Sequence, residues 1–137
     1  MKLSHLPARV TAGALILNAG LDIKKLPDEA AAGMQDMGAN GVPPVKKLSP
    51  GTFRKALSRS EVALGAALLT PFVPSWMAGA GLAGFSGALM AMYFRTPEMT
   101  KEDGIRPTEA GTPIAKDAIM FGTGVTLMLD DLMRTKK

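Results

Sequence analysis

Any chemistry of this chain would depend mainly on its carboxyl and amino side chains, because its 137 residues include no cysteine and only one histidine. Without cysteine, disulfides, thiolate nucleophiles and cysteine-ligated zinc sites are excluded. The single histidine, His5, excludes a two-histidine metal centre within one chain, and its place near the N-terminus is typical of an ordinary polar residue. We therefore predict no metal site, and the sequence contains no recognisable nucleophile–base arrangement.

A set of polar residues at the ends of the apolar segments is the candidate binding site. Glu61 precedes a long apolar run and is the candidate catalytic residue, since a carboxyl group there can accept or donate a proton. A lysine beside it can hold an anionic oxygen. The simpler interpretation is that opposite charges pair and lysines extend to the membrane surface, which would fix the helix ends. The candidate residues are Asn18, Asp22, Lys25, Glu61, Lys116 and Asp117.

The charge-free segments predict the elements that position these residues. No charged residue or histidine occurs between Val62 and Phe94, and this run is too long for one membrane span of about 20 residues. Pro71 and Pro74 divide it into a helical hairpin, because proline ends a helix. Two shorter apolar stretches, 10–21 and 118–129, become long enough to span if their flanking basic residues reach the interface.

We predict from these segments an all-α, single-domain protein covering residues 1–137. Its architecture is a four-helix transmembrane bundle with spans at about 6–25, 56–72, 75–94 and 114–133. The polar connections 26–55 and 95–113 lie on the same side, and the first includes a short amphipathic helix that starts near Leu26. A soluble helical bundle is the alternative, because the first and last stretches are also short enough for buried helices.

Small residues at four-residue spacing mark the predicted third span. Such spacing places them on one helix face, where another backbone can approach closely. The face is explained either by contact within the bundle or by a helix from another protein. The candidate partner-binding residues are Gly79, Ala83, Gly84, Gly87 and Ala91.

The motifs and their order resemble the DoxX family of small bacterial membrane proteins over most of the chain. The resemblance implies a four-helix transmembrane bundle with a polar helix inserted after the first span. The Pro- and Gly-rich stretch 33–50 and the long connection before the last span depart from the family pattern. The matching features are Arg9-Val10-x-x-Gly13, Gly20-Leu21-Asp22-x-x-Lys25, Glu61 followed by Leu64-Gly65-Ala66-Ala67-Leu68-Leu69, Lys116, and Gly122-x-Gly124.

Two functions follow from the residues and from the resemblance. The first is a non-catalytic accessory or scaffold subunit of a larger membrane complex, which needs no cofactor. The alternative is the membrane subunit of a quinone-linked oxidoreductase, because DoxX family members are associated with quinone-linked sulfur oxidation. In that case the polar residues around Glu61 would surround a quinone ring or a lipid headgroup. A small transporter is the weakest candidate, because no charged residue lies in the middle of a predicted span.

The expected location is the bacterial cytoplasmic membrane, with several spans, and the expected partners are lipid and other membrane subunits. Lys and Arg are more numerous in the long connections than near the termini, which predicts cytoplasmic connections and external termini. Lys2 and Arg9, before the first span, favour the opposite orientation. The net charge of +4 is modest, so we predict no nucleic-acid binding. Anionic lipid headgroups match the basic residues Lys46, Lys47, Arg54, Lys55 and Arg59.

Overall fold

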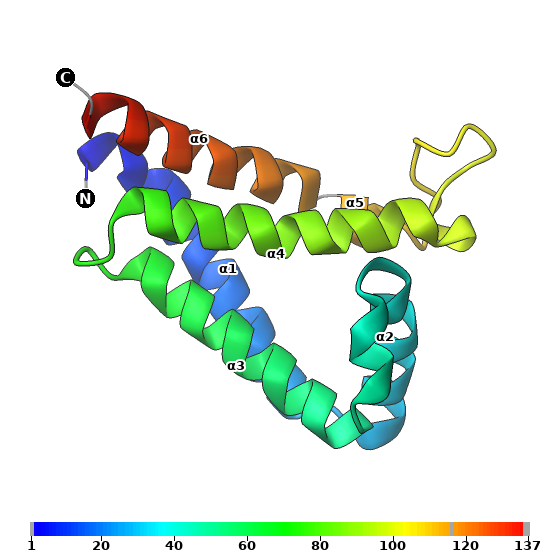
Figure 1. The fold of residues 1–137 in the computed structure, drawn as a ribbon. Helices are drawn as coiled ribbons and strands as arrows, with labels where there is room; N and C mark the ends of the chain where they lie inside the picture. Colours follow the sequence, from blue (N-terminus) through cyan, green and yellow to red (C-terminus); the bar gives the residue numbers. More distant parts are fainter. Residues whose placement is uncertain (1, 116, 136–137) are drawn as a thin grey trace.

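The computed structural model describes residues 2–115 and 117–135, and this part of the chain is helical with no β-strand. The predicted all-α class is therefore confirmed. The four long helices are α1 (Leu6–Lys24), α3 (Pro50–Leu69), α4 (Ser75–Arg95) and α6 (Asp117–Thr135). Two shorter helices are α2 (Asp28–Gly41) and α5 (Thr112–Ala115) (Figure 1).

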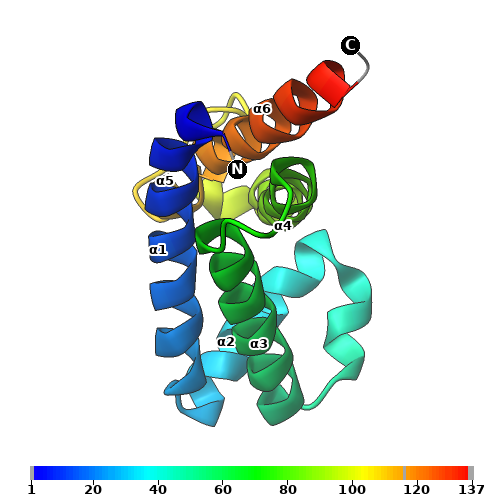
Figure 2. The same ribbon diagram turned by 90° about the vertical axis from the view of Figure 1, so that its left-hand side faces the viewer.

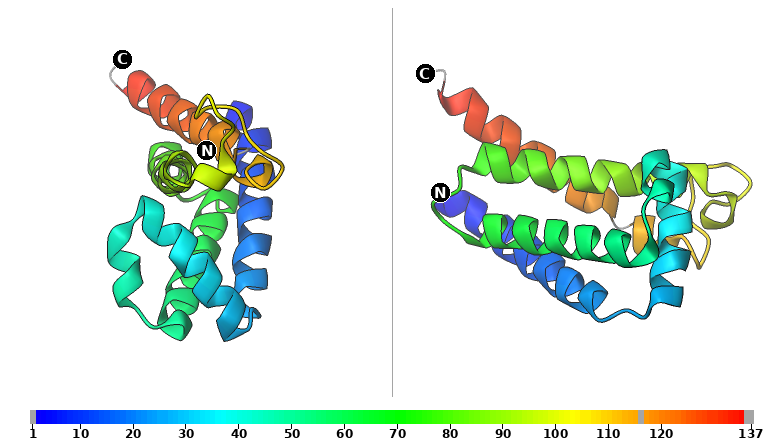
Figure 3. Two further views of the ribbon diagram at one scale, coloured as in Figure 1. Left: turned by 90° about the vertical axis from the view of Figure 1, so that its right-hand side faces the viewer. Right: turned by 60° about the horizontal axis from the view of Figure 1, so that its bottom comes forward.

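The long helices form two pairs, in which α1 packs along α3 and α4 packs along α6 (Figure 2). A short turn joins α3 to α4, and the two helices diverge from it, with both chain termini at the same end (Figure 1). At the open end α2 lies across α3 and α4 and contacts both (Figure 3). The helix predicted after the first span therefore exists, and it closes the space between the two pairs.

Glycines make the close contact within each pair possible. An added Cβ at Gly65 of α3 would lie 2.7 Å from the backbone nitrogen of Leu17 in α1. An added Cβ at Gly79 of α4 would lie 2.6 Å from the carbonyl oxygen of Gly124 in α6. Each side chain would collide with backbone that cannot easily move, so both pairs depend on a position without Cβ.

The start of α3 lies earlier than the predicted residue 56, because the chain provides a cap there. The Oγ of Ser49 accepts a hydrogen bond from the Thr52 amide at 3.2 Å, and Pro50 occupies the first helical position. Serine at the cap and proline directly after it are both favourable at a helix N-terminus. The helix ends at Leu69, just before the proline-containing turn.

The connection 95–113 is more ordered than the loop predicted from its prolines and glycines. It contains a 3-10 turn at Pro97–Met99, an isolated bridge between Thr100 and Pro107, and α5. Gly104 has a φ of 71°, a value that favours glycine. The hydroxyl of Tyr93 donates to the carbonyl oxygen of Ile105 at 2.7 Å, which ties the connection to α4.

One helix of the described residues, α4, is long and apolar enough by composition to cross a membrane. The other three long helices do not meet this criterion, so the four-span topology predicted from the sequence is supported here for one span only. The main core lies where all four long helices meet, near the end that carries the termini. It consists of Ala12, Ile16, Leu68, Ala78, Leu82 and Leu127.

Candidate functional site

A cavity of about 380 Å³ lies between α2, α3 and α4, with Ile114 of α5 also in its wall. Figure 1 shows the ribbons of α3 and α4 diverging, with α2 across their open end. Its wall is mostly apolar: α2 contributes Met34 and Met37, α3 contributes Phe53, and α4 contributes Phe85. The volume falls within the range of small-molecule sites, which are typically apolar with few polar groups.

Glu61 is the acidic residue in the wall of this cavity, and it is almost fully buried, with 7% of its surface exposed. Its Oε2 atom has no hydrogen-bond partner among the described residues. A buried polar atom without a partner costs free energy, and a buried unpaired charge costs more. The cavity wall therefore includes a carboxyl group with a buried, unpaired oxygen, and the hydroxyl residue Ser60 lies next to it in the chain.

Contact between α1 and α3 fixes the position of Glu61. An added Cβ at Gly20 of α1 would lie 2.9 Å from the Cβ of Glu61, so the two helices touch directly at this level. One turn earlier, the Oγ of Ser58 donates to the carbonyl oxygen of Gly20 at 2.7 Å. Both contacts hold this turn of α3 rigidly against α1, which leaves the Glu61 side chain at the cavity wall.

Of the other residues of the predicted polar site, the structure brings Asp117 near Glu61 and places Asn18, Asp22 and Lys25 elsewhere. Asn18 and Asp22 lie exposed on α1 and bond to each other, with Nδ2 of Asn18 donating to Oδ2 of Asp22 at 3.2 Å. Lys25 is exposed beyond the end of α1. Asp117, at the start of α6, is close enough for its charge to act on Glu61. Lys116 lies outside the described residues.

Arg9 has a role that the sequence analysis missed. Charge predicts that Arg9 pairs with Asp130 or Asp131, and Asp131 is close enough for its charge to act on the guanidinium. The guanidinium is also fully buried and donates hydrogen bonds mainly to backbone oxygens. Its Nε donates to the carbonyl oxygen of Leu68 at 2.8 Å, and Nη2 donates to that of Thr70 at 2.7 Å. These carbonyl groups belong to the end of α3, where backbone acceptors lack helical partners. The remaining acceptors are the carbonyl oxygens of Ala67 and Val73 and the Oγ of Ser75.

His5 is also buried, which differs from its interpretation as an ordinary polar residue near the terminus. Its Nδ1 lies 2.9 Å from the Oγ of Ser75, and its Nε2 lies 2.7 Å from Oδ2 of Asp130. These three types of residue form nucleophilic sites in hydrolases. Here Ser75 is 2% exposed and also accepts a bond from Arg9, so substrate has no access to it. The arrangement joins the residue just before α1 to α4 and α6. In the sequence, the four-residue spacing of His5 and Arg9 was the feature that could have indicated their shared contact with Ser75.

Most of the small residues on α4 that were predicted to bind a partner contact other parts of this chain instead. Gly79 and Ala83 pack against Gly124 of α6, and an added Cβ at Gly87 would lie 3.5 Å from the ring of Phe121. Gly84 differs, since an added Cβ would meet nothing within 4 Å. Ala91 is half-buried. Of the predicted partner-binding residues, Gly84 is therefore the one on an open face.

Comparisons with protein-family models, with curated proteins and with solved structures give no match to this chain. The resemblance to the DoxX family therefore rests on the motifs quoted above. Among the described residues, no three or more histidine, aspartate or glutamate side chains gather in a way that could hold a metal ion.

Proposed function

We propose that this chain is a small integral membrane protein of the bacterial cytoplasmic membrane, with its four long helices in the bilayer. The observation that supports this most strongly is the number of large apolar side chains that face outward. Leu15 on α1 is 62% exposed, Met77 on α4 is 50% exposed and Ile119 on α6 is 72% exposed. Soluble monomers rarely expose broad apolar surfaces of this kind, whereas lipid requires them.

The positions of the charges explain how helices of moderate hydropathy can belong to such a bundle. Arg9 of α1 and Glu61 of α3 lie inside the predicted spans, and both are buried in the protein. Charged residues in membrane helices face the bundle interior and pair with backbone carbonyls, as Arg9 does here. The long helices contain 19 to 21 residues, which gives about 30 Å, the thickness of the hydrocarbon core.

Within that membrane setting we propose a non-catalytic accessory or scaffold function. Gly84 lies on an open face of α4, and α4 is the helix best suited to lipid. Helices associate in membranes through such small-residue faces because their backbones can approach closely. The proposed partner is another membrane subunit whose helix packs against this face.

Purification of the tagged protein from native membranes, followed by mass spectrometry, tests both parts of this proposal. We expect the protein to require detergent for extraction and to retain a stoichiometric membrane partner. Gly84→Leu should release the partner. Gly122→Leu is the matched control, because Gly122 on α6 is also open. Extraction without detergent would contradict the membrane placement, and equal partner recovery in both variants would contradict the role of the Gly84 face.

The second candidate is the membrane subunit of a quinone-linked oxidoreductase, and the unpaired oxygen of Glu61 beside an apolar cavity favours it. A carboxyl group at that point could exchange a proton with a quinone ring oxygen while partner subunits carry the electrons. Organic extraction of the purified complex should then yield quinone. Glu61→Gln should abolish turnover and leave the complex assembled, whereas full turnover in this variant would reject the role.

A further inference from the structure

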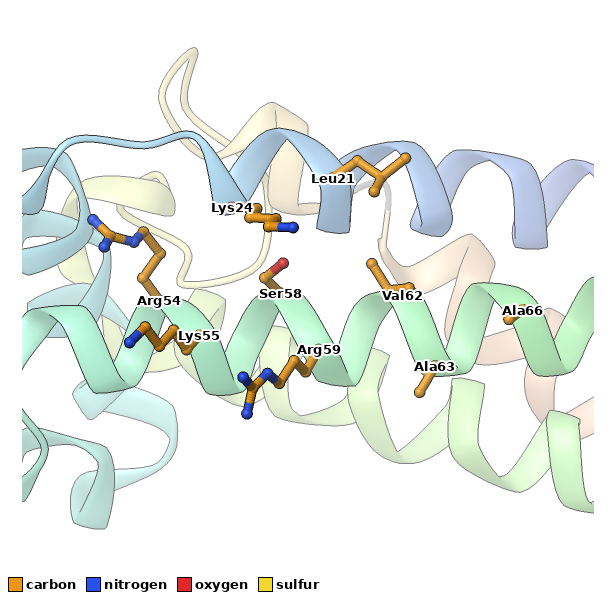
Figure 4. Close-up of a pocket in the computed structure, with 9 residues that line it drawn as sticks. All are labelled: Leu21, Lys24, Arg54, Lys55, Ser58, Arg59, Val62, Ala63 and Ala66. Carbon is orange, nitrogen blue, oxygen red and sulfur yellow. The ribbon is translucent and has the colours of Figure 1, made fainter.

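A second hollow, of about 550 Å³, runs along the surface between α1 and α3 (Figure 4). One end of this groove is basic, with Lys24 from α1 and Arg54, Lys55 and Arg59 from α3. The other end is apolar, with Leu21, Val62, Ala63 and Ala66. We propose that the groove binds an anionic phospholipid, its phosphate at the basic end and one acyl chain along the apolar end. This inference rests on the proposed membrane placement.

Three of the four basic residues at this end of the groove have no acidic partner within the described residues. Arg54 is paired, because its Nη1 lies 2.6 Å from Oδ1 of Asp28 and also donates to the carbonyl oxygen of Leu26 at 2.9 Å. Lys24, Lys55 and Arg59 have no described carboxylate within ion-pair distance. Three positive charges therefore share one end of the groove, and an anion there would lower their mutual repulsion.

The length of the groove fits one leaflet of a bilayer. From Arg59, at the basic end, to Ala66 the helix rises about 10 Å at its normal pitch, which lies within half of the hydrocarbon core, about 15 Å. The basic residues occupy the N-terminal part of α3, and the apolar residues follow toward its C-terminus, as Figure 4 shows. A lipid headgroup at the surface and a chain toward the bilayer centre have this same order.

The floor of the groove is suited to an acyl chain because its polar groups are already satisfied. Ser58 is buried and donates its Oγ proton to the carbonyl oxygen of Gly20 at 2.7 Å. Beyond it, the short side chains of Ala63 and Ala66 leave room beside Val62 and Leu21. A free phosphate ion would use the basic half only, so the apolar half is the reason to assign a lipid.

Reconstitution with defined lipids tests this assignment on the full chain. The protein would be placed in nanodiscs of phosphatidylglycerol and phosphatidylcholine with identical acyl chains, and the lipids it retains would be counted by native mass spectrometry. The test variant combines Lys24→Gln, Lys55→Gln and Arg59→Gln. Its matched control combines Arg95→Gln, Lys101→Gln and Arg106→Gln, which removes the same charge from exposed residues outside the groove.

We expect one phosphatidylglycerol molecule to be retained in preference to phosphatidylcholine. In the test variant this preference should fall by roughly 100-fold, because each basic group near an anionic lipid contributes roughly five-fold. The control variant should keep it. Equal retention of both lipids, or an equal loss in both variants, would overturn the assignment.

A change of shape without a change of charge gives a second, independent test. Ala63→Phe should fill the apolar half of the groove and reduce retention of phosphatidylglycerol, whereas Ala14→Phe, exposed on α1 outside the groove, should not. Release of the lipid by millimolar inorganic phosphate, with no effect of Ala63→Phe, would indicate a simple anion site and reject the lipid. A protein found in the membrane without lipid preference would refute this inference alone, whereas a protein that needs no detergent would refute the membrane placement.

Discussion

The guanidinium of Arg9, near the start of α1, donates to the carbonyl oxygen of Thr70, just beyond the end of α3, at 2.7 Å. This bond connects residues 61 positions apart in the chain. Through it and its neighbouring bonds, one side chain closes the end of α3 and orders the turn that leads to α4. The divergence of the two helix pairs from this turn, and hence the cavity beside Glu61, depends on that closure.

Replacement of Arg9 should therefore destabilise the whole fold. Arg9→Leu removes the donors for four backbone carbonyl groups that are buried or partly buried, so we expect the free energy of unfolding to fall by about 3–5 kcal/mol. Thermal unfolding in detergent, followed by circular dichroism, measures this. Arg95→Leu, at an exposed arginine on α4, is the control. Equal melting temperatures for the two variants would show that the bonds of Arg9 contribute little.

Two glycine substitutions should change stability in opposite directions. Gly65→Ala places a Cβ 2.7 Å from the Leu17 nitrogen, and we expect a loss of about 1–3 kcal/mol as α1 and α3 are pushed apart. Gly33→Ala lies on α2 with nothing within 4 Å, and alanine should stabilise that helix by about 0.5–1 kcal/mol. Denaturant unfolding of both variants distinguishes them. A stabilising Gly65→Ala would contradict the close contact.

The turn around Asp103 should lose order in acid. The amides of Ile105 and Arg106 donate to its Oδ1, each at 3.0 Å, and with the Arg106 side chain they hold the pKa of Asp103 well below its usual range. Because the folded pKa lies below the unfolded pKa of about 3.9, the stabilisation is present above that pH and is lost as the pH falls through the folded pKa. Hydrogen exchange at the Ile105 amide, relative to the intrinsic rate, should therefore accelerate in acid. Asp103→Ala should remove this pH dependence and Glu102→Ala should keep it.

The helical class and the turn between α3 and α4 could be predicted because each depends on residues that are close together in the chain. Proline spacing and the absence of charge act over a few residues. The position of Glu61 at the head of an apolar run is likewise a local feature of the sequence, so this residue could be predicted as a candidate. The resulting helices match the predicted spans to within a few residues, apart from the earlier start of α3.

The partners of individual side chains could not be predicted, because they depend on how distant helices meet. Arg9 and Asp130 have opposite charges, yet Arg9 bonds to carbonyl groups and Asp130 bonds to His5 and Lys2. Backbone acceptors at a helix end are not visible as charges in a sequence. The residues of the predicted polar site are likewise divided, since Asn18 and Asp22 are exposed while Glu61 lines a cavity and Asp117 lies close enough to act on it.

Replacement of Glu61 should separate the effect of its carboxyl group on stability from its effect on function. Its Oε2 is buried without a partner among the described residues, so the carboxyl group reduces the stability of the folded protein. Glu61→Leu should raise the free energy of unfolding by about 1–2 kcal/mol in the purified protein, because an apolar side chain of similar size fits the apolar wall. Glu61→Gln should leave it nearly unchanged.

Glu29→Leu is the control, because Glu29 is exposed on α2 and lies outside the cavity wall, so the same leucine there should not stabilise the protein. Residues that reduce stability are commonly kept where function needs them, and a more stable but inactive Glu61→Leu variant would identify the cavity as the functional site. A less stable Glu61→Leu variant would show instead that the carboxyl group is bonded in the native protein, and its role would then be to hold α3 in place.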